Sequence, residues 1–307
     1  MGLKMDLWVE KYRPVKIEDL ILDTKIVDLL RSWINIGDVP NILFSGSPGS
    51  GKTTIAKILI SSIPCEYIYI NASDERGIDT FRDRVKDFIC SKSLSGRRIV
   101  VLDESDYITA EGQAILRGYL EEYSSNARFI MTCNYHTKII NPILSRLQHI
   151  HLKSEVDKIW VTDYLSGILK NEKVKFESTD VSTIVSLFYP DIRKCINELQ
   201  KNVINNNLQK FDVTSFSSDI MKEIVKGDIT AIRTILSVSN PDYLLIYRSL
   251  FEKFSTLHTK SIENKETVGK ILITIAEYLY RHEFVVDKEI NFIACIILIM
   301  NHLKTFK

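Results

Sequence analysis

The fold is decided by nine consecutive residues, Gly46-Ser47-Pro48-Gly49-Ser50-Gly51-Lys52-Thr53-Thr54. Their spacing is G-x-x-x-x-G-K-T, in which glycines let the backbone curl so that successive N–H groups point at phosphate oxygens. An apolar run at 41–44 precedes the stretch and an amphipathic run at 53–60 follows it, which predicts strand, loop and helix in that order. A chance glycine-rich turn does not explain both flanks. We therefore predict a nucleotide-binding loop in which Lys52 meets the outer phosphates and Thr53 offers a hydroxyl to Mg²⁺.

A second polar group ends an apolar segment. Residues 98–106 read RIVVLDESD, a run of apolar residues followed by two adjacent acids. The run is typical of a buried parallel strand, and ligands bind at the carboxyl ends of such strands. We expect Asp103 to hold Mg²⁺ and Glu104 to polarise an attacking water, because neighbouring strand residues point to opposite faces. In isolation, the pair would indicate two solvated carboxylates in a turn.

The pattern of apolar residues predicts an α/β domain followed by helices. The expected strands are 41–44, 67–70, 99–102, 129–132 and 149–152, each followed by a turn or a helical segment, as in a mostly parallel sheet. Only helical patterns follow, and the polar tract 205–207 predicts a linker. We expect three domains: an α/β core at 1–152, a small helical domain at 153–210 and an all-helical domain at 211–307.

Composition narrows the class of protein. Among 307 residues, 40 are Lys or Arg and 39 are Asp or Glu, so the formal net charge is +1. A chain this neutral does not coat nucleic acid by bulk charge, and DNA binding would need a local basic patch. The five cysteines form no C-x-x-C pair, which argues against structural zinc and against a disulfide framework.

No segment is expected to enter a membrane. The longest apolar run, Phe292–Met300, has nine residues, too few to cross a bilayer. The first 14 residues lack the apolar core of a signal peptide. We therefore expect a soluble, cytoplasmic chain that is not secreted. The helix around 292–300 has almost no polar face, so it is either a core helix or one that packs on a neighbouring subunit.

Further segments match one family in order and spacing. They are WVEKYRP at 8–14, NASDERGI at 71–78, TCN at 132–134, SR at 145–146 and DIRKCINELQ at 191–200. Together they resemble the ATPase subunits of sliding-clamp loaders in the AAA+ superfamily: the replication factor C small subunits and, more closely, the large subunit of the T-even-phage clamp loader. The resemblance covers residues 8–200 well and the tail only loosely. It implies a RecA-like AAA+ core, a helical lid at 153–210 and a helical collar for oligomerisation at 211–307.

The resemblance also implies roles for individual residues and two ligands, ATP and Mg²⁺. Tyr12 and Arg13 would lie against the nucleotide base. Asn134 corresponds to sensor 1, Arg146 to the finger that reaches the neighbouring subunit's ATP, and Arg193 to the lid arginine called sensor 2. Without the family, the last three would indicate a turn amide, a solvated arginine and a helix-surface ion pair. Three positions depart from the family pattern without removing a charge the chemistry needs, and they favour the phage branch: Ser105, Leu147 and Pro190.

A basic segment offers a path to DNA. Between residues 76 and 98 the chain carries seven basic and three acidic side chains, a local charge of +4. Arg82 and Lys86 are four residues apart on a predicted helix and, with Arg76, could follow a phosphate backbone without reading bases. Because Asp83 and Asp87 are adjacent, a salt-bridged solvated face is the alternative.

A second predicted helix, at 111–123, carries Gln113 and Arg117 on one edge that we expect to be exposed. It resembles the Q-x-x-L-R segment that links DNA to the ATP site in clamp loaders. Where the family often has a second arginine, this chain has Gly118. Here DNA could reposition the end of the strand that carries Asp103 and Glu104, and so release hydrolysis.

These features predict an ATPase subunit of a sliding-clamp loader. The expected partners are a sliding clamp, primer–template DNA and other loader subunits, in a hetero-oligomer with several copies of this chain. ATP binding would open the clamp, and primer–template DNA would trigger hydrolysis and clamp release. One rival is another AAA+ DNA motor of the branch-migration type, which would be expected to carry a winged-helix tail. A non-hydrolysing scaffold would be expected to lack Lys52, Glu104 or Arg146. Frequent Lys and Asn hint at a viral source.

Overall fold

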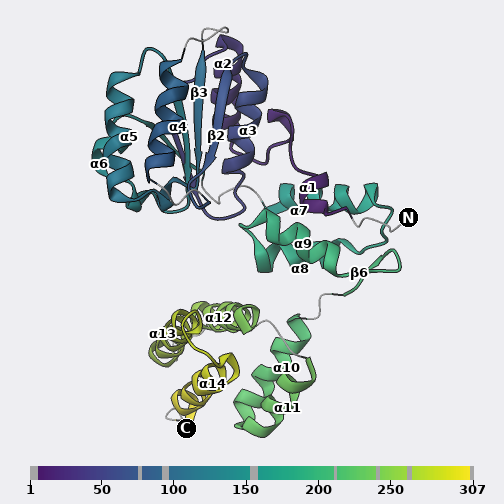
Figure 1. Cartoon of the computed structure of the whole chain (residues 1–307). Helices are drawn as coiled ribbons and strands as arrows, with labels where there is room; N and C mark the ends of the chain where they lie inside the picture. Colours follow the sequence, from purple (N-terminus) through teal and green to yellow (C-terminus); the bar gives the residue numbers. More distant parts are fainter. Residues whose placement is uncertain are drawn as a thin grey trace. The chain divides into compact units, whose positions relative to one another are not determined.

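The structure is a computed structural model that describes residues 6–74, 78–91, 97–152, 158–210, 213–239, 243–260 and 265–304. The chain divides into two compact units, Met1–Leu208 and Gln209–Lys307 (Figure 1). The first unit contains the residues of both the predicted core and the predicted lid. The boundary that we expect between those two, at 152, stays a prediction.

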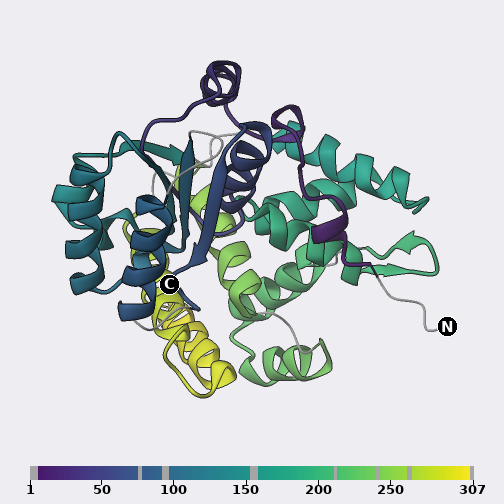
Figure 2. The same cartoon turned by 45° about the horizontal axis from the view of Figure 1, so that its top comes forward.

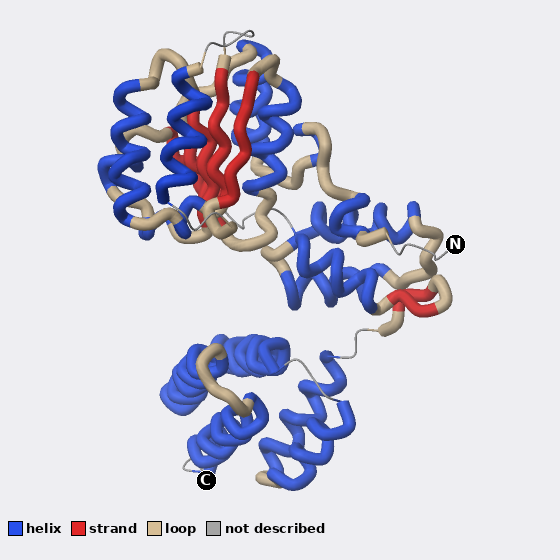
Figure 3. Tube along the Cα trace, viewed as in Figure 1, coloured by secondary structure: helices blue, strands red, loops and turns tan. Residues whose placement is uncertain are grey.

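A parallel sheet forms the centre of the first unit (Figure 3). Its strands are β1 (Ile42–Gly46), β2 (Glu66–Asn71), β3 (Arg98–Asp103), β4 (Arg128–Cys133) and β5 (Gln148–Leu152), in the order β2-β3-β4-β1-β5. All neighbouring pairs are parallel. Each strand lies within two residues of its predicted bounds, so the predicted α/β fold is confirmed.

Helices cover both faces of this sheet (Figure 1). On one face lie α2 (Thr24–Ile36) and α3 (Lys52–Ser62), and on the other α4 (Ile78–Cys90) and α5 (Ala110–Glu122), with the short α6 (Asn141–Leu144). Strand residues alternate between the two apolar clusters, as period-two geometry requires. In β1, for example, Phe44 belongs to the α2–α3 side and Leu43 to the α4–α5 side. Burial on both faces explains why the strands are continuous apolar runs.

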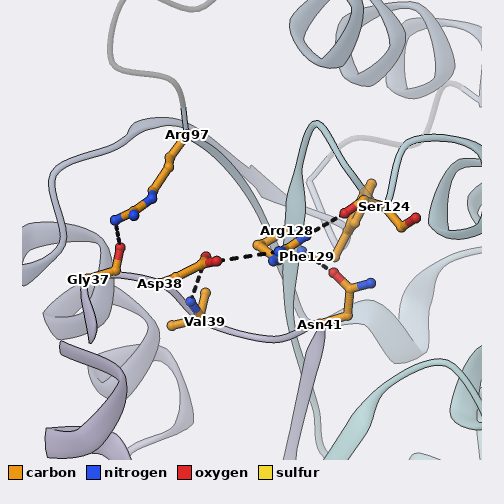
Figure 4. Close-up of polar contacts among 8 residues, drawn as sticks. All are labelled: Gly37, Asp38, Val39, Asn41, Arg97, Ser124, Arg128 and Phe129. Carbon is orange, nitrogen blue, oxygen red and sulfur yellow. Dashed lines mark hydrogen bonds and ion pairs between the residues drawn. The ribbon is translucent and has the colours of Figure 1, made fainter. Parts of the chain in front are cut away.

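The amino-terminal edge of the sheet is fastened by polar side chains (Figure 4). Arg128 Nη2 lies 3.3 Å from Asp38 Oδ2, and Asn41 Oδ1 accepts the Phe129 N–H at 3.0 Å. Arg97, just before β3, donates to the carbonyl of Gly37. These bonds tie the starts of β1, β3 and β4 together, and the nucleotide-binding loop follows β1 at the opposite edge.

Three helices and a hairpin complete the first unit. The helices are α7 (Lys158–Asn171), α8 (Ser178–Phe188) and α9 (Ile192–Lys201), and the hairpin strands are β6 (Val203–Ile204) and β7 (Asn207–Leu208). The linker predicted at 205–207 is therefore wrong. Asn205 and Asn206 have φ of 50° and 58° and form the turn of the hairpin, a conformation that asparagine tolerates.

The amino-terminal segment belongs with these helices. Helix α1 (Trp8–Lys11) lies beside α9 in Figure 2, and the Trp8 N–H donates to Gln200 Oε1 at 3.0 Å. Gln200 Nε2 in turn donates to the Asp6 carbonyl at 2.9 Å. Asp6 and Trp8 are thus held by the last helix before the hairpin.

The described part of the second unit is helical, as predicted. Its helices are α10 (Val213–Lys226), α11 (Ile229–Ser239), α12 (Tyr243–Lys260), α13 (Lys265–His282) and α14 (Lys288–Lys304). In α14, Phe292, Ile296 and Ile299 are fully buried in the unit's apolar core, while Ile290 is 68% exposed. The helix is therefore a core helix with an apolar outer edge. Among the described residues, no helix is long and apolar enough to cross a membrane.

Candidate nucleotide-binding site

The predicted phosphate loop joins β1 to α3 and touches the start of α9. Gly49 has φ of 75°, and a Cβ on it would lie 2.0 Å from Asp191 Oδ1. Asp191 caps α9 by accepting the Lys194 N–H at 2.9 Å. Only glycine fits at this close approach, which brings the loop and the helix carrying Arg193 to the same place.

Lys52 is the buried cation of the loop. Its side chain is 8% exposed, and Nζ donates to the carbonyls of Gly46 and Ser47, both at 2.9 Å. Burial lowers the pKa of Lys52, because desolvation disfavours the ammonium. Ser47 Oγ is buried and has no hydrogen-bond partner among the described residues. A loop with a desolvated cation and an unused hydroxyl suits an anion with several oxygen acceptors, such as a nucleotide phosphate.

Asp103, at the end of β3, is held by three hydroxyls. Thr53 Oγ1 lies 3.0 Å from each of its carboxylate oxygens, Tyr69 OH donates to Oδ2, and Thr132 Oγ1 donates to Oδ1. The structure thus brings the predicted pair Thr53 and Asp103 together. Oxygen donors of this kind suit Mg²⁺, so the residues present fit the metal.

Sequence analysis missed Tyr69 and Thr132. Tyr69 lies two residues before Asn71, the last residue of β2, and Thr132 lies two residues before Asn134, which directly follows β4. Residues two apart in a strand share a face. This periodicity on the strands near β3 was the signal that could have found them. Burial and the hydrogen bond to Asp103 both raise the pKa of Tyr69, so its phenol remains a proton donor.

Glu104 and Asn134 face the same cavity from adjacent strand ends. Glu104 has φ of 55°, a left-handed conformation, and its N–H donates to Thr132 Oγ1 at 3.1 Å. Asp106 accepts the N–H groups of Asn134 and Tyr135, each at 3.3 Å. The carboxylate of Asp106 therefore fixes the backbone that presents Asn134, a role that sequence analysis did not assign.

These side chains line one polar cavity. Its walls include a cation, two acids, a hydroxyl, an amide and a lid arginine: Lys52, Asp103, Glu104, Thr53, Asn134 and Arg193. Three of the four predicted catalytic residues and both predicted metal ligands therefore meet in one place. The arrangement can hold a polyphosphate, a divalent cation and a water.

An adjoining cleft extends from the loop to the amino-terminal segment. It is lined by Tyr12, Arg13, Gly51, Thr54 and Arg193, together with apolar side chains of the amino-terminal segment and α9. It continues directly from the phosphate cavity, since Gly51, Thr54 and Arg193 line both.

The two predicted base-binding residues are anchored to neighbouring elements. Tyr12 OH donates to Glu172 Oε1 at 2.7 Å, and the Tyr164 hydroxyl donates to the Tyr12 carbonyl at 2.8 Å. Burial and this bond to Glu172 raise the pKa of Tyr12 to about 12. Arg13 forms an ion pair with Glu10 at 2.8 Å. The cleft is therefore closed on one side by a segment tied to the residues around α7.

Arg146 lies away from this cavity. It follows α6, its Nη2 is 2.5 Å from Glu121 Oε1, and its Nη1 donates to the Pro142 carbonyl at 2.6 Å. It does not line either cavity. A catalytic role for Arg146 would thus require another chain's nucleotide.

Known proteins identify the family. The family model described as "ATPase family associated with various cellular activities (AAA)" matches residues 42–155. The replication factor C small subunit of Picrophilus torridus is 33% identical over 296 residues, which cover 90% of this chain and 92% of that protein. This chain belongs to the replication factor C small-subunit family. The small subunit of Methanocella arvoryzae is 34% identical over 271 residues, covering 80% of this chain and 84% of the relative.

The family confirms the predicted class, an AAA+ clamp-loader subunit and ATPase. A solved structure of the RuvB Holliday junction branch migration motor of Thermotoga maritima is 13% identical and has a TM-score of 0.52. The match covers 75% of this chain and 86% of that one. At this identity the likeness shows the shared fold alone. The predicted affinity to the phage branch, and with it a viral source, stays a prediction.

Of the five predicted DNA-binding residues, two lie on α4, two lie on α5 and one lies outside the described residues. Arg82 and Lys86 are exposed on α4, and Arg82 Nε forms an ion pair with Asp83 Oδ1 at 3.0 Å. Arg117 is exposed on α5. Arg76 lies outside the described residues. The predicted exposure is therefore confirmed at three of the five positions.

Gln113 is not exposed, and that expectation was wrong. The side chain is 4% exposed; Nε2 donates to the carbonyls of Ile108 at 3.1 Å and Lys138 at 2.9 Å, and Oε1 accepts the Ile140 N–H at 2.9 Å. Helical spacing does place it one turn before Arg117, but the segment at 138–140 covers it. Through these hydrogen bonds, Gln113 joins α5 to the segment between β4 and α6.

Proposed function

We propose that this chain is an ATP-hydrolysing subunit of a sliding-clamp loader whose active sites are shared between neighbouring subunits. One observation carries the proposal. A single cavity holds the groups needed to bind and activate a nucleotide, while Arg146 lies outside it on an exposed edge. The site is thus complete apart from the cation that stabilises charge on the transferred phosphate.

Nucleotide binding follows from the two adjoining cavities. The base enters the cleft beside Tyr12 and Arg13, and the phosphates meet the backbone of residues 46–54, the amino terminus of α3 and Lys52. Thr53 and Asp103 would hold Mg²⁺. When bound, Mg²⁺ would neutralise charge on the phosphate oxygens.

Hydrolysis requires a water aligned with the terminal phosphate. Glu104 lines the cavity beside Asn134, so its carboxylate can polarise the water and accept its proton. Asn134 can orient that water or the phosphate through its amide, on a backbone held by Asp106. Arg193, on α9, contributes a positive charge that reports the terminal phosphate to the lid.

The remaining charge comes from a neighbour. Arg146 of one subunit would reach the nucleotide of the next, in a hetero-oligomer with several copies of this chain held together through the collar at 211–307. The interaction is worth roughly 10³–10⁵ in rate in other NTPases. Because ATP then lies between subunits, its binding and hydrolysis can change how they fit together.

Such an assembly could couple hydrolysis to clamp loading. ATP binding would hold the assembly in the form that opens a sliding clamp, and primer–template DNA would trigger hydrolysis and release. Support comes from the exposed cations of α4 and α5 and from Gln113, which connects α5 to the segment that follows Asn134. DNA at α5 could therefore shift Asn134 relative to Glu104.

Steady-state ATP hydrolysis tests the proposal. The chain, purified with its co-purifying partner, is assayed without DNA, with blunt duplex and with recessed primer–template, each with and without the candidate clamp. We expect strong stimulation by primer–template and clamp together, abolished by Arg146→Ala. Equal turnover on every DNA, indifferent to the clamp, would favour the branch-migration motor. Absence of turnover under all conditions would favour the non-hydrolysing scaffold.

A further inference from the structure

Tyr69 lies against the predicted metal ligand, although it belongs to none of the nucleotide-binding motifs. It is on β2, whose pairing with β3 places Asn71 opposite Asp103 and Tyr69 opposite Val101. The side chain reaches forward along the sheet, and its hydroxyl donates to Asp103 Oδ2. The ring packs at the margin of the apolar cluster beneath α2 and α3, and Lys57 Nζ lies 5.6 Å from its centroid. The hydrogen bond of the hydroxyl and the packing of the ring therefore both fix the position of the Tyr69 side chain.

The three hydroxyls around Asp103 are not equivalent. Thr53 bonds both carboxylate oxygens, but its hydroxyl is itself the predicted Mg²⁺ ligand. Thr132 Oγ1 donates to Asp103 Oδ1 and also accepts the backbone N–H of Glu104, so it contacts both acidic residues. Tyr69 is the donor to Oδ2 that does not itself belong to the predicted metal site. If the Thr53 hydroxyl coordinates Mg²⁺, Tyr69 and Thr132 are the two remaining hydroxyls that orient the Asp103 carboxylate.

We propose that Tyr69 is a positioning residue for Mg²⁺: its hydroxyl fixes the rotation of the Asp103 carboxylate so that the acid and Thr53 present their oxygens together. The inference rests on the proposed nucleotide-binding function. Hydrogen bonds that orient a metal ligand typically account for about 10–100-fold in metal affinity. The phenol contacts neither nucleotide cavity directly, since it lines neither. Its effect should therefore appear in the metal-dependent part of nucleotide binding.

The test compares ADP binding to the full chain in Mg²⁺ and in EDTA by calorimetry. Tyr69→Phe keeps the ring in the apolar cluster and removes only the hydroxyl. We expect the gain in ADP affinity that Mg²⁺ provides to fall by about 10-fold, with the affinity in EDTA unchanged. Mn²⁺ titration of the ADP complex, followed by electron paramagnetic resonance, should show the same loss. Tyr67→Phe is the matched control: it removes a phenol from the same strand, two residues earlier and 53% exposed.

Three results would overturn the inference while leaving the proposed function in place. The first is an equal Mg²⁺-dependent gain in Tyr69→Phe and the wild type. The second is an equal loss of ADP affinity with and without Mg²⁺, which would mean a merely structural role. The third is an equal loss in Tyr67→Phe. If instead the wild type itself gained nothing from Mg²⁺, the magnesium part of the proposed function would fail first and the inference with it. Thermal melting of each variant establishes that it is folded.

Discussion

At the scale of single residues, Lys52 shows how a site can be prepared for an anion. Lys52 is 8% exposed, its ammonium donates to two backbone carbonyls and to the Ser50 hydroxyl, all of them neutral acceptors, and its pKa is lowered by burial. Phosphate oxygens would supply negative charge. The buried charge of Lys52 therefore destabilises the nucleotide-free protein and stabilises the complex with the nucleotide.

This predicts the behaviour of Lys52→Met, which keeps the aliphatic stem and removes the charge. At pH 7 ADP affinity should fall by about 10–100-fold, because hydrogen bonds to charged groups contribute about 1.5–3 kcal/mol. Calorimetric titration measures it. Lys25→Met removes an exposed lysine on α2 that lines neither cavity, and it should leave ADP affinity unchanged. Equal affinities for Lys52→Met and the wild type would contradict the assignment.

The pH dependence of the same residue has a definite sign. Since burial lowers the pKa of Lys52, the unfolded chain binds the extra proton between this lowered pKa and the ordinary value of about 10.4. Stability of the free wild type, relative to Lys52→Met, should therefore rise with pH across that window. ADP affinity should fall in the same window, because the deprotonated amine no longer attracts phosphate. At several alkaline pH values, urea unfolding measures the stability of the free protein and calorimetry measures its ADP affinity.

At the scale of elements, α5 is joined to the segment after β4 through one buried amide. Gln113 donates to two backbone carbonyls and accepts one backbone N–H in partly buried surroundings. Gln113→Leu should lower the free energy of unfolding by about 1–3 kcal/mol, since it removes three hydrogen bonds, each of which contributes about 0.5–1.5 kcal/mol. It should also abolish the stimulation of ATP hydrolysis by primer–template DNA. Urea unfolding and steady-state hydrolysis measure the two effects.

Arg117→Ala, one turn later on the exposed side of α5, separates the two roles of this helix. It should change stability by less than about 0.5 kcal/mol, as is usual for surface positions. If Arg117 contacts DNA, the variant should weaken DNA binding without altering basal hydrolysis. A Gln113→Leu variant that keeps wild-type stability and DNA stimulation would remove the connection we infer between α5 and Asn134.

The same elements show what sequence alone could predict. Motif spacing gave the phosphate loop, Asp103 and Glu104 because their chemistry is local to one strand end. The burial of Gln113 depends on a segment 25 residues away, which helical periodicity does not register. The hairpin at 203–208 was mistaken for a linker because Asn205 and Asn206 suit both a solvated tract and a turn with positive φ. Tyr69 was missed because its role comes from the pairing of β2 with β3.

At the scale of the whole molecule, the first unit contains every described residue of the nucleotide site, and its exposed Arg146 lines neither of the two cavities. Two variants that each lack a different part of the shared active site should therefore restore ATP hydrolysis when they assemble together. Lys52→Met lacks the phosphate cation but keeps the finger, whereas Arg146→Ala lacks the finger but keeps the site.

Assembled separately with the partner subunits, each variant should be nearly inactive in primer–template-stimulated ATP hydrolysis. When the two are mixed in equal amounts before assembly, about one quarter of the contacts between copies should join an intact site to an intact finger, because head-to-tail interfaces pair two different surfaces. Recovery toward a quarter of wild-type turnover would place the arginine in the neighbour's site. A mixture carrying the double variant Lys52→Met/Arg146→Ala with either single variant should recover nothing, which controls for changes in assembly. If Arg146→Ala alone kept full turnover, or if the mixed single variants stayed inactive in assemblies of normal size, the shared active site would be ruled out.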